Sequence, residues 1–293
     1  MKKVILVTGV SSGLGLSLTV KLASCGHIVY ATMRNLQKKA ALQEALNTQG
    51  VHANLLECDV ASTQSVENSV KTIIDQEGRI DCLINNAGRG FIKTTEQASE
   101  QDIADVLNTN FMGVVRTTKA VLPHMRQKRS GHIINISSVG GLIGQPFNEV
   151  YCASKFAVEG YTESLACYVQ PFFNIAFSLI EPGGIQSQFV NNILSDYSQQ
   201  DLDEDYKPVL ARYLGSAQDR AGQSDSEPVY QSSDEVANCV IEVLNSKNPP
   251  LRVRTSNWAR DFCQLKTQVD PDGTLSVERV YKNFLDVQEE STV

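Results

Sequence analysis

Three side chains with complementary acid–base chemistry lie within a short stretch of the chain. Tyr151 and Lys155 are four residues apart, and Ser138 precedes Tyr151 by thirteen residues. On a helix, residues four apart share one face, with Cβ atoms about 5–6 Å apart. A free phenol titrates near pH ~10, and a neighbouring ammonium group stabilises the phenolate and lowers its pKa. Together with the Ser138 hydroxyl, the pair could move a proton on or off an alcohol oxygen.

The elements around this stretch would bring the three groups to one point. The apolar run 132–136 reads as a buried strand that ends just before Ser138, and a helix is expected over 150–170, ending before Pro171. The connecting segment contains Gly140, Gly141, Gly144 and Pro146. It can therefore bend back and place Ser138 over the start of the helix. A Tyr-x-x-x-Lys pair alone also occurs on many helices by chance, so upstream motifs must support this interpretation.

A glycine-rich turn near the start of the chain is the first such motif. The run 3–8 (KVILVT) predicts a strand, Gly9-Val-Ser-Ser-Gly13-Leu-Gly15 follows, and 16–24 reads as a helix. Glycines let backbone amides approach a phosphate, and the helix dipole favours the anion. The spacing differs from the Gly-x-Gly-x-x-Gly fingerprint, and in isolation the loop could be only a tight turn.

The second predicted strand, 27–33, carries the signal for the choice of cofactor. In NAD-selective sites an acidic residue near the end of this strand holds the ribose 2′-hydroxyl, but here the chain reads Ala-Thr-Met-Arg34-Asn. Arg34 could pair with a 2′-phosphate, and Ser11 could donate to the same group. We therefore expect NADP(H) to be preferred. The alternative is that Arg34 is an ordinary solvated loop residue.

Polar residues also follow the third and fourth predicted strands, 51–57 and 81–84. Asp59 is placed to meet an adenine edge, although it would serve equally well as a turn or cap before a helix over 62–77. Asn85-Asn86-Ala87-Gly88 suits a ligand crevice at the carboxyl end of a strand, and it also suits an ordinary turn.

Asn110 is a poor choice for the middle of the long helix expected over 100–128. This local inconsistency indicates either a functional role or a buried side-chain hydrogen bond.

Strands alternate with helices along the whole chain. A sixth strand, 174–180, is followed by the loop 181–187, and the second half adds a helix over 234–244, a strand over 251–255 and helices over 257–267 and 276–286. We predict one α/β domain over 1–293, a Rossmann-like, doubly wound parallel sheet of about seven strands with helices on both faces. Residues 1–190 would form the cofactor-binding and catalytic core, the polar segment 191–230 a substrate lid, and 231–293 the final elements.

Composition excludes several classes of protein. The chain has 293 residues, 42% of them hydrophobic, and a formal net charge of −7. The acidic balance and the lack of a basic block disfavour nucleic acid as a partner, and no apolar run is long enough to span a membrane. Seven scattered cysteines are typical of free thiols in a reducing compartment, so we expect a cytoplasmic protein. Four unclustered histidines suggest no metal site.

In their order and spacing, these motifs resemble the classical short-chain dehydrogenase/reductase family over about the first 190 residues. The matching positions are Thr8 to Gly15, Asp59, Asn85 to Gly88, Asn110, Ser138, Tyr151, Lys155, Pro182 and Gly183. The stretch from Ser138 to Ala157 and the run Tyr30 to Asn35 look like the branch that contains 17β-hydroxysteroid dehydrogenase type 1 and photoreceptor-type retinol dehydrogenase.

The resemblance implies a role for each catalytic position. Tyr151 would be the acid in carbonyl reduction and the base in alcohol oxidation. Lys155 would depress the pKa of Tyr151 and hold the nicotinamide ribose, and Ser138 would hydrogen-bond the substrate oxygen. Asn110 would hold a water that connects Lys155 to solvent.

The resemblance also implies where the cofactor and the substrate bind. The pyrophosphate and adenosine side would be held by Gly9, Ser11, Ser12, Gly13, Leu14, Gly15, Arg34, Asp59, Val60, Asn86, Ala87 and Gly88. The nicotinamide carboxamide would be held by Pro182, Gly183, Ile185 and Ser187, with Tyr151 and Lys155 beside it. An apolar substrate pocket would include Leu142, Ile143, Phe147, Phe189 and Val190, together with Ser138, although core packing explains any one of these apolar residues equally well.

The expected activity is hydride transfer between NADP(H) and a lipophilic, steroid- or retinoid-like alcohol or carbonyl. Oestrogen specificity is not carried over, because 191–230 is hard to align with the branch. Two alternatives are a reductase of small ketones and a non-catalytic NADPH-binding regulatory protein. The family leads us to expect a homodimer or homotetramer. The final Ser291-Thr292-Val293 matches a weak PDZ-ligand pattern.

Overall fold

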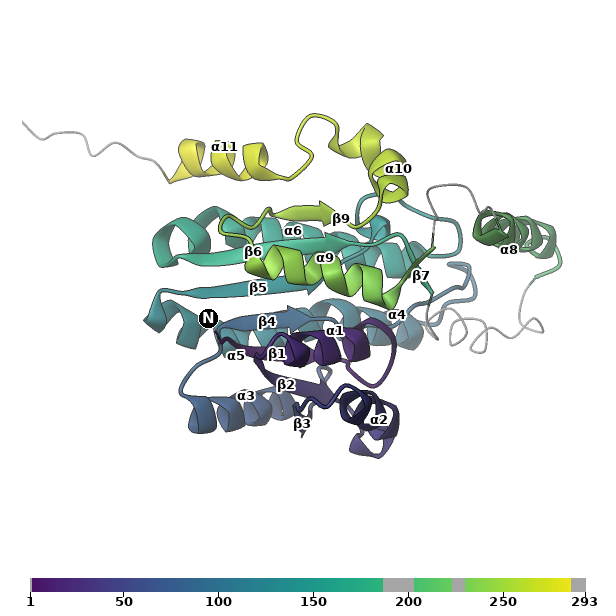
Figure 1. Ribbon diagram of the computed structural model, residues 1–293. Helices are drawn as coiled ribbons and strands as arrows, with labels where there is room; N and C mark the ends of the chain where they lie inside the picture. Colours follow the sequence, from purple (N-terminus) through teal and green to yellow (C-terminus); the bar gives the residue numbers. More distant parts are fainter. Residues whose placement is uncertain (1, 187–202, 223–229, 286–293) are drawn as a thin grey trace, which may run out of the picture.

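A seven-stranded parallel sheet forms the centre of the molecule (Figure 1). The computed structural model describes residues 2–186, 203–222 and 230–285. The strand order is β3-β2-β1-β4-β5-β6-β9, and every neighbouring pair in it is parallel. The strands are β1 (Val4–Thr8), β2 (Ile28–Met33), β3 (Asn54–Glu57), β4 (Cys82–Asn85), β5 (Gly131–Ile136), β6 (Ile175–Glu181) and β9 (Arg252–Arg254). The predicted fold class is confirmed.

Helices cover both faces of the sheet and create two separate cores. In β1, Ile5 and Val7 belong to one core, while Val4 and Leu6 belong to the other. Because both faces are buried, the strand reads as a continuous apolar run. The first core is covered by α1 (Gly13–Ser24), α2 (Ala40–Thr48) and α9 (Ser233–Asn245), and the second by α3 (Thr63–Glu77), α5 (Gly113–Lys128) and α6 (Glu149–Phe173) (Figure 1).

The order of the strands reverses between β1 and β4. From β1 the chain moves outward to β2 and β3, and then returns to the other side of β1 as β4. The loops after β1 and β4 therefore leave the sheet in opposite directions and open a crevice at the carboxyl ends of the strands, which is where open α/β sheets bind ligands.

Several predicted boundaries differ from the structure. The third strand begins at Asn54 rather than at 51, and the segment after β2 forms a 3₁₀ turn, Leu36–Lys38, followed by α2. The helix expected to end before Pro171 continues to Phe173. Proline removes one helical hydrogen bond, but Phe173 packs against the second core, and this contact stabilises the additional residues.

The long helix expected over 100–128 is interrupted at its centre. It consists of α4 (Glu100–Leu107), a π-helical turn (Asn108–Met112) and α5. π-turns in helices are frequent at functional sites, and this one contains Asn110, the residue that helix propensity marks as inconsistent.

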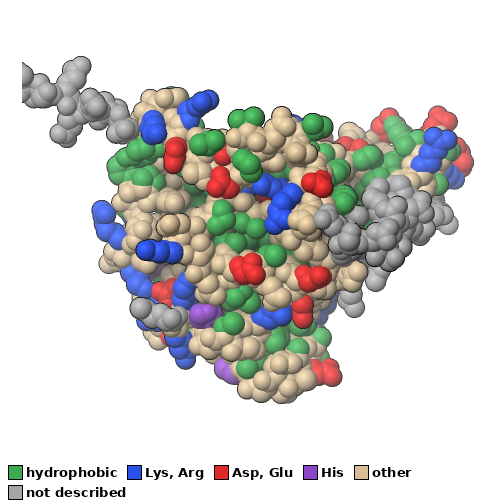
Figure 2. All heavy atoms as spheres, turned by 45° about the horizontal axis from the view of Figure 1, so that its top comes forward, with side chains coloured by type: hydrophobic (Ala, Val, Ile, Leu, Met, Phe, Trp, Pro, Cys, Tyr) green, Lys and Arg blue, Asp and Glu red, His purple; other side chains and the backbone are tan. Residues whose placement is uncertain are grey.

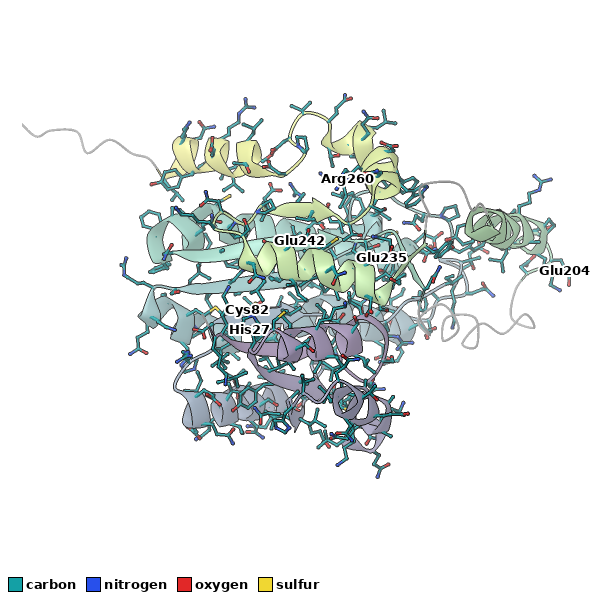
Figure 3. The ribbon with its side chains drawn as sticks, viewed as in Figure 1. His27, Cys82, Glu204, Glu235, Glu242 and Arg260 are labelled. Atoms are coloured by element: carbon teal, nitrogen blue, oxygen red, sulfur yellow. The ribbon has the colours of Figure 1, made fainter. Side chains whose placement is uncertain are left out.

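The segment that follows β6 adds elements at the carboxyl edge of the sheet. Strand β7 (Gly184–Gln186) pairs in parallel with β8 (Tyr230–Ser232), a small sheet that sequence patterning does not predict. Within the predicted lid, α8 (Lys207–Gly222) is described. Figure 3 shows Glu204, just before α8, at the opposite end of the molecule from Cys82 and His27, which lie near the amino ends of the strands. The last helices are α10 (Asn257–Thr267) and α11 (Thr274–Phe284).

Charged side chains of both signs lie on the surface, and most of the cysteines lie in the interior. On the face shown in Figure 2, acidic and basic side chains occur side by side over much of the area. All seven cysteines are free, and five of them are buried. Among the described residues, no helix is long and apolar enough to cross a membrane, and no group of three or more His, Cys, Asp or Glu side chains could hold a metal ion.

One buried histidine predicts how stability changes with pH. His132 on β5 is 7% exposed, its Nε2 lies 3.0 Å from Ser178 Oγ, and burial lowers its pKa to about 3. The unfolded chain takes up this proton below about pH 6.5, whereas the folded protein does not. The free energy of unfolding is therefore not reduced by His132 above about pH 6.5. As the pH falls from 6.5 towards 3, it decreases by about 1.4 kcal/mol per pH unit.

We expect His132 alone to lower the free energy of unfolding by about 2 kcal/mol between pH 7 and pH 5. Urea unfolding at both pH values measures the loss in the wild type and in His132→Gln, in which an uncharged amide can replace the ring nitrogen. The loss should be about 2 kcal/mol smaller in the variant. An equal loss in both proteins would show that His132 does not titrate in this way.

Candidate active site

Ser138 and Tyr151 meet across a tight turn at the carboxyl end of β5. Ser138 caps the 3₁₀ turn Val139–Gly141, and its Oγ accepts a hydrogen bond of 3.0 Å from the Gly140 amide. A Cβ atom on Gly140 would lie 3.3 Å from Tyr151 Cε1 and 3.4 Å from Ser138 Oγ. The turn therefore lies directly against the tyrosine ring, and a glycine at its centre leaves room for the two hydroxyl-bearing side chains to converge.

Lys155 extends from α6 into the same buried region. It is 7% exposed, its Nζ donates a 2.8 Å hydrogen bond to the Ile136 carbonyl, and Nζ lies 5.8 Å from the centroid of the Tyr151 ring. Burial lowers the pKa of Lys155 to about 8, and the negative charge of Glu159 acts in the opposite direction. Lys155 is therefore mainly in the ammonium form at neutral pH and becomes mainly the neutral amine above about pH 8.

The expected lowering of the Tyr151 pKa by Lys155 is wrong for this structure. Burial raises the pKa of Tyr151 to about 12, and the hydrogen bond with Ser138 only partly opposes this. Desolvation of the phenolate outweighs the stabilising contacts, because taking a charge out of water is costly. At neutral pH Tyr151 therefore holds its proton, which is the form that can donate to a carbonyl oxygen.

Asn110 joins the π-helical turn to the site and to the loop after β4. It is 1% exposed, its Oδ1 accepts from the Arg89 amide at 2.8 Å, and its Nδ2 donates to the Arg89 carbonyl at 2.9 Å and to Ser154 Oγ at 3.1 Å. A Cβ on Gly88 would lie 3.4 Å from Asn110 Oδ1 and 3.9 Å from Lys155 Nζ. Asn110, Gly88 and Lys155 are therefore neighbours. The proposed water relay remains a prediction.

The loops after β1 and β4 interlock at the crevice. Gly9 has φ +73°, and a Cβ there would lie 2.6 Å from Ala87 Cα. Asn86 Nδ2 donates to the carbonyls of Thr8 and Gly9, both at 2.9 Å, and Thr8 Oγ1 accepts from the amides of Asn86 and Ala87. Thr8 therefore holds both loops in position, whereas the sequence identifies it only as the first residue of the glycine-rich motif.

The start of α1 has the properties of an anion site. Gly13 has φ +54°, and a Cβ on Gly15 would lie 2.3 Å from the Gly9 carbonyl oxygen, so no larger residue fits this approach. Ser12 precedes the helix without a side-chain cap, and Ser11 is half-buried beside it. Leu14 contributes only backbone here, because its side chain lies in the first core. This close cradle at a helix N-terminus fits a dinucleotide pyrophosphate.

The remaining adenosine-side residues are arranged around the same edge. Arg34 directly follows β2 and is exposed, and it forms no ion pair within the described part of the chain. Asp59 makes the local turn allowed by its sequence context, since its Oδ1 accepts from the Ala61 amide at 3.0 Å. Val60 is buried against Gly113, where a Cβ would lie 2.9 Å from Val60 Cγ2. Asp59 therefore has at least the structural role, and an adenine contact remains a prediction.

The loop expected to hold the carboxamide follows β6. The Val139 amide donates a 3.0 Å hydrogen bond to the Pro182 carbonyl, which ties this loop to the turn that carries Ser138. Gly183 comes next, and Ile185 in β7 packs against the first core. Ser187 lies outside the described residues.

The residues expected to line a substrate pocket fall into two groups. Leu142 and Ile143 pack with Trp258 and Cys263 of α10. Phe147 packs instead against Leu210 of α8. The predicted pocket residues Phe189 and Val190 lie outside the described part of the chain.

Phe147 connects the catalytic segment with α8. It has φ +61°, is 6% exposed and packs with Leu210, and its ring centroid lies 5.8 Å from that of Tyr213. Asn148 Nδ2 donates to Tyr213 OH at 2.9 Å. A bulky residue in the left-handed region is unusual, and here the apolar contacts with α8 stabilise it.

Sequence reasoning missed a cluster of buried charges behind the site. Glu159 on α6 and Glu181 at the end of β6 are 4% and 0% exposed. Both interact with Arg252 of β9. A glutamate one helical turn after Lys155 and another directly before Pro182 were visible in the sequence, but only the fold shows that they meet.

Comparison with known proteins agrees with this geometry. The model of the short chain dehydrogenase family matches residues 3–198. Retinol dehydrogenase 8 of Bos taurus is 40% identical over 279 residues, which cover 94% of this chain and 88% of that protein. 17-beta-hydroxysteroid dehydrogenase type 1 of Mus musculus is 35% identical, covering 95% of this chain and 80% of that protein.

A solved structure gives the same result in three dimensions. The F189W actinorhodin polyketide ketoreductase with NADPH superimposes with a TM-score of 0.74 at 27% identity, covering 86% of this chain and 95% of the ketoreductase. The likeness thus extends over most of both chains.

Proposed function

The chain belongs to the short chain dehydrogenase family and is an oxidoreductase, and we propose that it transfers hydride between NADP(H) and a lipophilic alcohol or carbonyl. One observation carries the proposal: Ser138, Tyr151 and Lys155 converge in a buried region next to the interlocked loops after β1 and β4. Acid–base groups beside a dinucleotide crevice are what reversible carbonyl reduction needs.

Each residue of the site would perform a step that its environment favours. A nicotinamide bound in the crevice supplies or accepts the hydride. Ser138 and Tyr151 hold the substrate oxygen between their hydroxyls, and Tyr151 donates its proton as negative charge develops on that oxygen. Lys155 places a buried positive charge near the phenolate that remains, where the low dielectric strengthens the attraction. In alcohol oxidation the same groups act in reverse.

The apolar contacts around the site support a large, lipophilic substrate. Phe147, Leu210 and Tyr213 form an apolar layer between the catalytic segment and α8. Pockets for small molecules are mostly apolar with a few polar groups that orient the ligand. The names of the similar proteins, retinol dehydrogenase 8 and 17-beta-hydroxysteroid dehydrogenase type 1, describe enzymes that act on such molecules.

A substrate panel tests the proposed class. Oxidation of NADPH is followed at the nicotinamide absorbance with retinal, a steroid ketone, a short aliphatic ketone and an aromatic ketone. Turnover of retinal or the steroid ketone supports the proposal. Turnover of only the small ketones would favour the alternative of a small-ketone reductase, and NADPH binding without any turnover would favour a non-catalytic binding protein.

The preference for NADP(H) depends on Arg34. Its side chain is exposed at the end of β2, no acidic residue occurs from Ala31 to Asn35, and a guanidinium group suits a phosphate. We expect Arg34→Ala to raise the dissociation constant for NADPH about tenfold or more while changing that for NADH little. Titration of cofactor fluorescence measures both constants.

Lys38→Ala is the matched control for Arg34→Ala, because it removes a basic residue from the 3₁₀ turn that follows Arg34. It should leave the ratio of the two dissociation constants unchanged. If Arg34→Ala weakens both cofactors equally, the 2′-phosphate is not recognised by this residue.

Self-association through α5 and α6, in a homodimer or homotetramer, is also proposed. Phe156, Tyr168 and Phe172 are exposed on α6, at 42%, 45% and 48%, and exposed apolar groups that gather on one element often mark an interface. A cytoplasmic location remains part of the same proposal.

A further inference from the structure

Two buried carboxyl groups lie behind the catalytic residues without enough donors to satisfy them. Glu159 Oε2 accepts a 3.1 Å hydrogen bond from Arg252 Nε, and the same nitrogen lies 3.6 Å from Glu181 Oε1. Glu181 Oε2 accepts from Arg254 Nη1 at 3.1 Å. The two remaining oxygens, Glu159 Oε1 and Glu181 Oε1, are buried without a well-aligned donor among the described residues, and the Ser137 hydroxyl beside Glu159 only partly favours the ionised form of that carboxyl.

Ionised carboxylates can only accept hydrogen bonds. Two ionised carboxylates that lie close together also repel each other, because they carry the same charge. The glutamates approach a common guanidinium nitrogen and interact with each other. One proton held between them would supply the missing donor and remove one of the two negative charges. Pairs of carboxyl groups in a shared site generally hold a proton in this way.

Burial also favours a bound proton, because a buried carboxyl group is more easily kept in its neutral form. Glu163 differs from the pair, since it contacts Arg252 from a more exposed position where water screens its charge. Burial raises the pKa of both Glu159 and Glu181, and that of Glu181 by more.

The pair is connected to the catalytic groups by short structural links. Glu159 is one helical turn after Lys155 on α6. A Cβ on Gly141, in the turn capped by Ser138, would lie 3.2 Å from Glu159 Oε1. Glu181 lies between Ile180 and Pro182, whose carbonyls accept hydrogen bonds from the amides of Ser137 and Val139 at 2.8 and 3.0 Å. The carboxyl pair therefore lies directly beneath the Ser138 turn.

We propose that Glu159 and Glu181 share one proton at neutral pH and act as positioning residues whose ionisation keeps Lys155 charged as the pH rises. Loss of the shared proton adds one negative charge behind Lys155. That charge stabilises the ammonium form at pH values where burial alone would neutralise it. The link to catalysis rests on the proposed function, whereas the shared proton does not.

The other titratable and charged groups around the pair are few. Among the described residues, those that interact with the pair or its partners are Lys155 and Glu163 on α6, Arg252 and Arg254 on β9, Cys263 on α10 and Asp270 after α10. Glu163 offers a matched control. It also pairs with Arg252, but it is two turns from Lys155 and 31% of its side chain is exposed.

Infrared spectroscopy of the full chain tests the shared proton directly. At pH 7 the wild type should show the carbonyl stretch of a buried protonated carboxyl group. This signal should disappear in Glu159→Gln and in Glu181→Gln, and remain in Glu163→Gln. A wild type without such a signal at pH 7 would overturn the proposal without any variant, so the test stands even if a variant fails to fold. A signal that persists in both single variants would overturn it equally.

The link to Lys155 is tested by the pH dependence of kcat/KM with NADPH and retinal. Both Glu159→Gln and Glu181→Gln should move the alkaline limb to lower pH by about one unit, while Glu163→Gln should leave it in place. A fall in kcat/KM that is equal at every pH would indicate a merely structural role and contradict the link. If the infrared result is obtained but the wild type turns over no substrate, the shared proton stands and the proposed function fails.

Discussion

Replacing Tyr151 by phenylalanine is expected to reduce kcat by about 10³-fold. The variant loses only the hydroxyl that donates the proton, while the ring that packs against Gly140 remains. The dissociation constant for NADPH, measured by fluorescence titration, should change less than about threefold, because the interlocked loops after β1 and β4 are untouched.

Tyr161→Phe is the matched control for Tyr151→Phe. Tyr161 lies on the same helix, ten residues further on, and packs edge-to-face against Phe111 with ring centroids 5.9 Å apart. Loss of its hydroxyl should leave kcat within about twofold of the wild type. If Tyr151→Phe retains turnover similar to that of Tyr161→Phe, Tyr151 is not the acid.

Gly9→Ala is expected to lower the free energy of unfolding by about 2–4 kcal/mol and to abolish measurable NADPH binding. Two effects combine at this position. An alanine must adopt φ near +73°, and its Cβ would lie 2.6 Å from Ala87 Cα. The loop after β4 must then move, and the hydrogen bonds from Asn86 to Thr8 and Gly9 move with it. Urea unfolding and fluorescence titration measure the two losses.

Gly26→Ala separates the two effects. Gly26 has φ +80°, but a Cβ there would meet no atom within 4 Å. We expect a loss of about 1–2 kcal/mol from backbone strain alone and an unchanged dissociation constant for NADPH. Equal losses of stability in the two variants would mean that the contact between Gly9 and Ala87 does not matter for folding.

Most of the fold could be predicted from the sequence because most strands of the main sheet are short, apolar runs followed by a turn or a helix. In β1, burial of both faces explains why residues 4–7 are all apolar. The β7–β8 pair could not be predicted, because Gly184 and its partner Tyr230 are 46 residues apart and neither strand has a clear pattern. Pro171 was misleading for a similar reason: local propensity disfavours a helix there, but tertiary packing stabilises it.

The catalytic residues could also be predicted, because their types and spacing are unusual together. Their electrostatics could not. The pKa of Tyr151 is raised because desolvation outweighs its favourable contacts, and burial of this kind depends on the whole fold. The same holds for Glu159 and Glu181, which are 22 residues apart and meet only through β6, β9 and α6. Asn110 is intermediate, since its poor helix propensity indicated the site and the π-turn explains it.

Transfer of deuterium from NADPH that carries deuterium at both C4 positions of the nicotinamide to a large apolar carbonyl tests the central claim most directly. The full chain is incubated with the labelled cofactor and retinal, and the product is examined by mass spectrometry. We predict retinol that is one mass unit heavier than the unlabelled product, formed by the wild type and not by Tyr151→Phe. Retinol without deuterium, or no product while NADPH binding is demonstrated, would contradict the assignment of this site as a hydride-transfer centre.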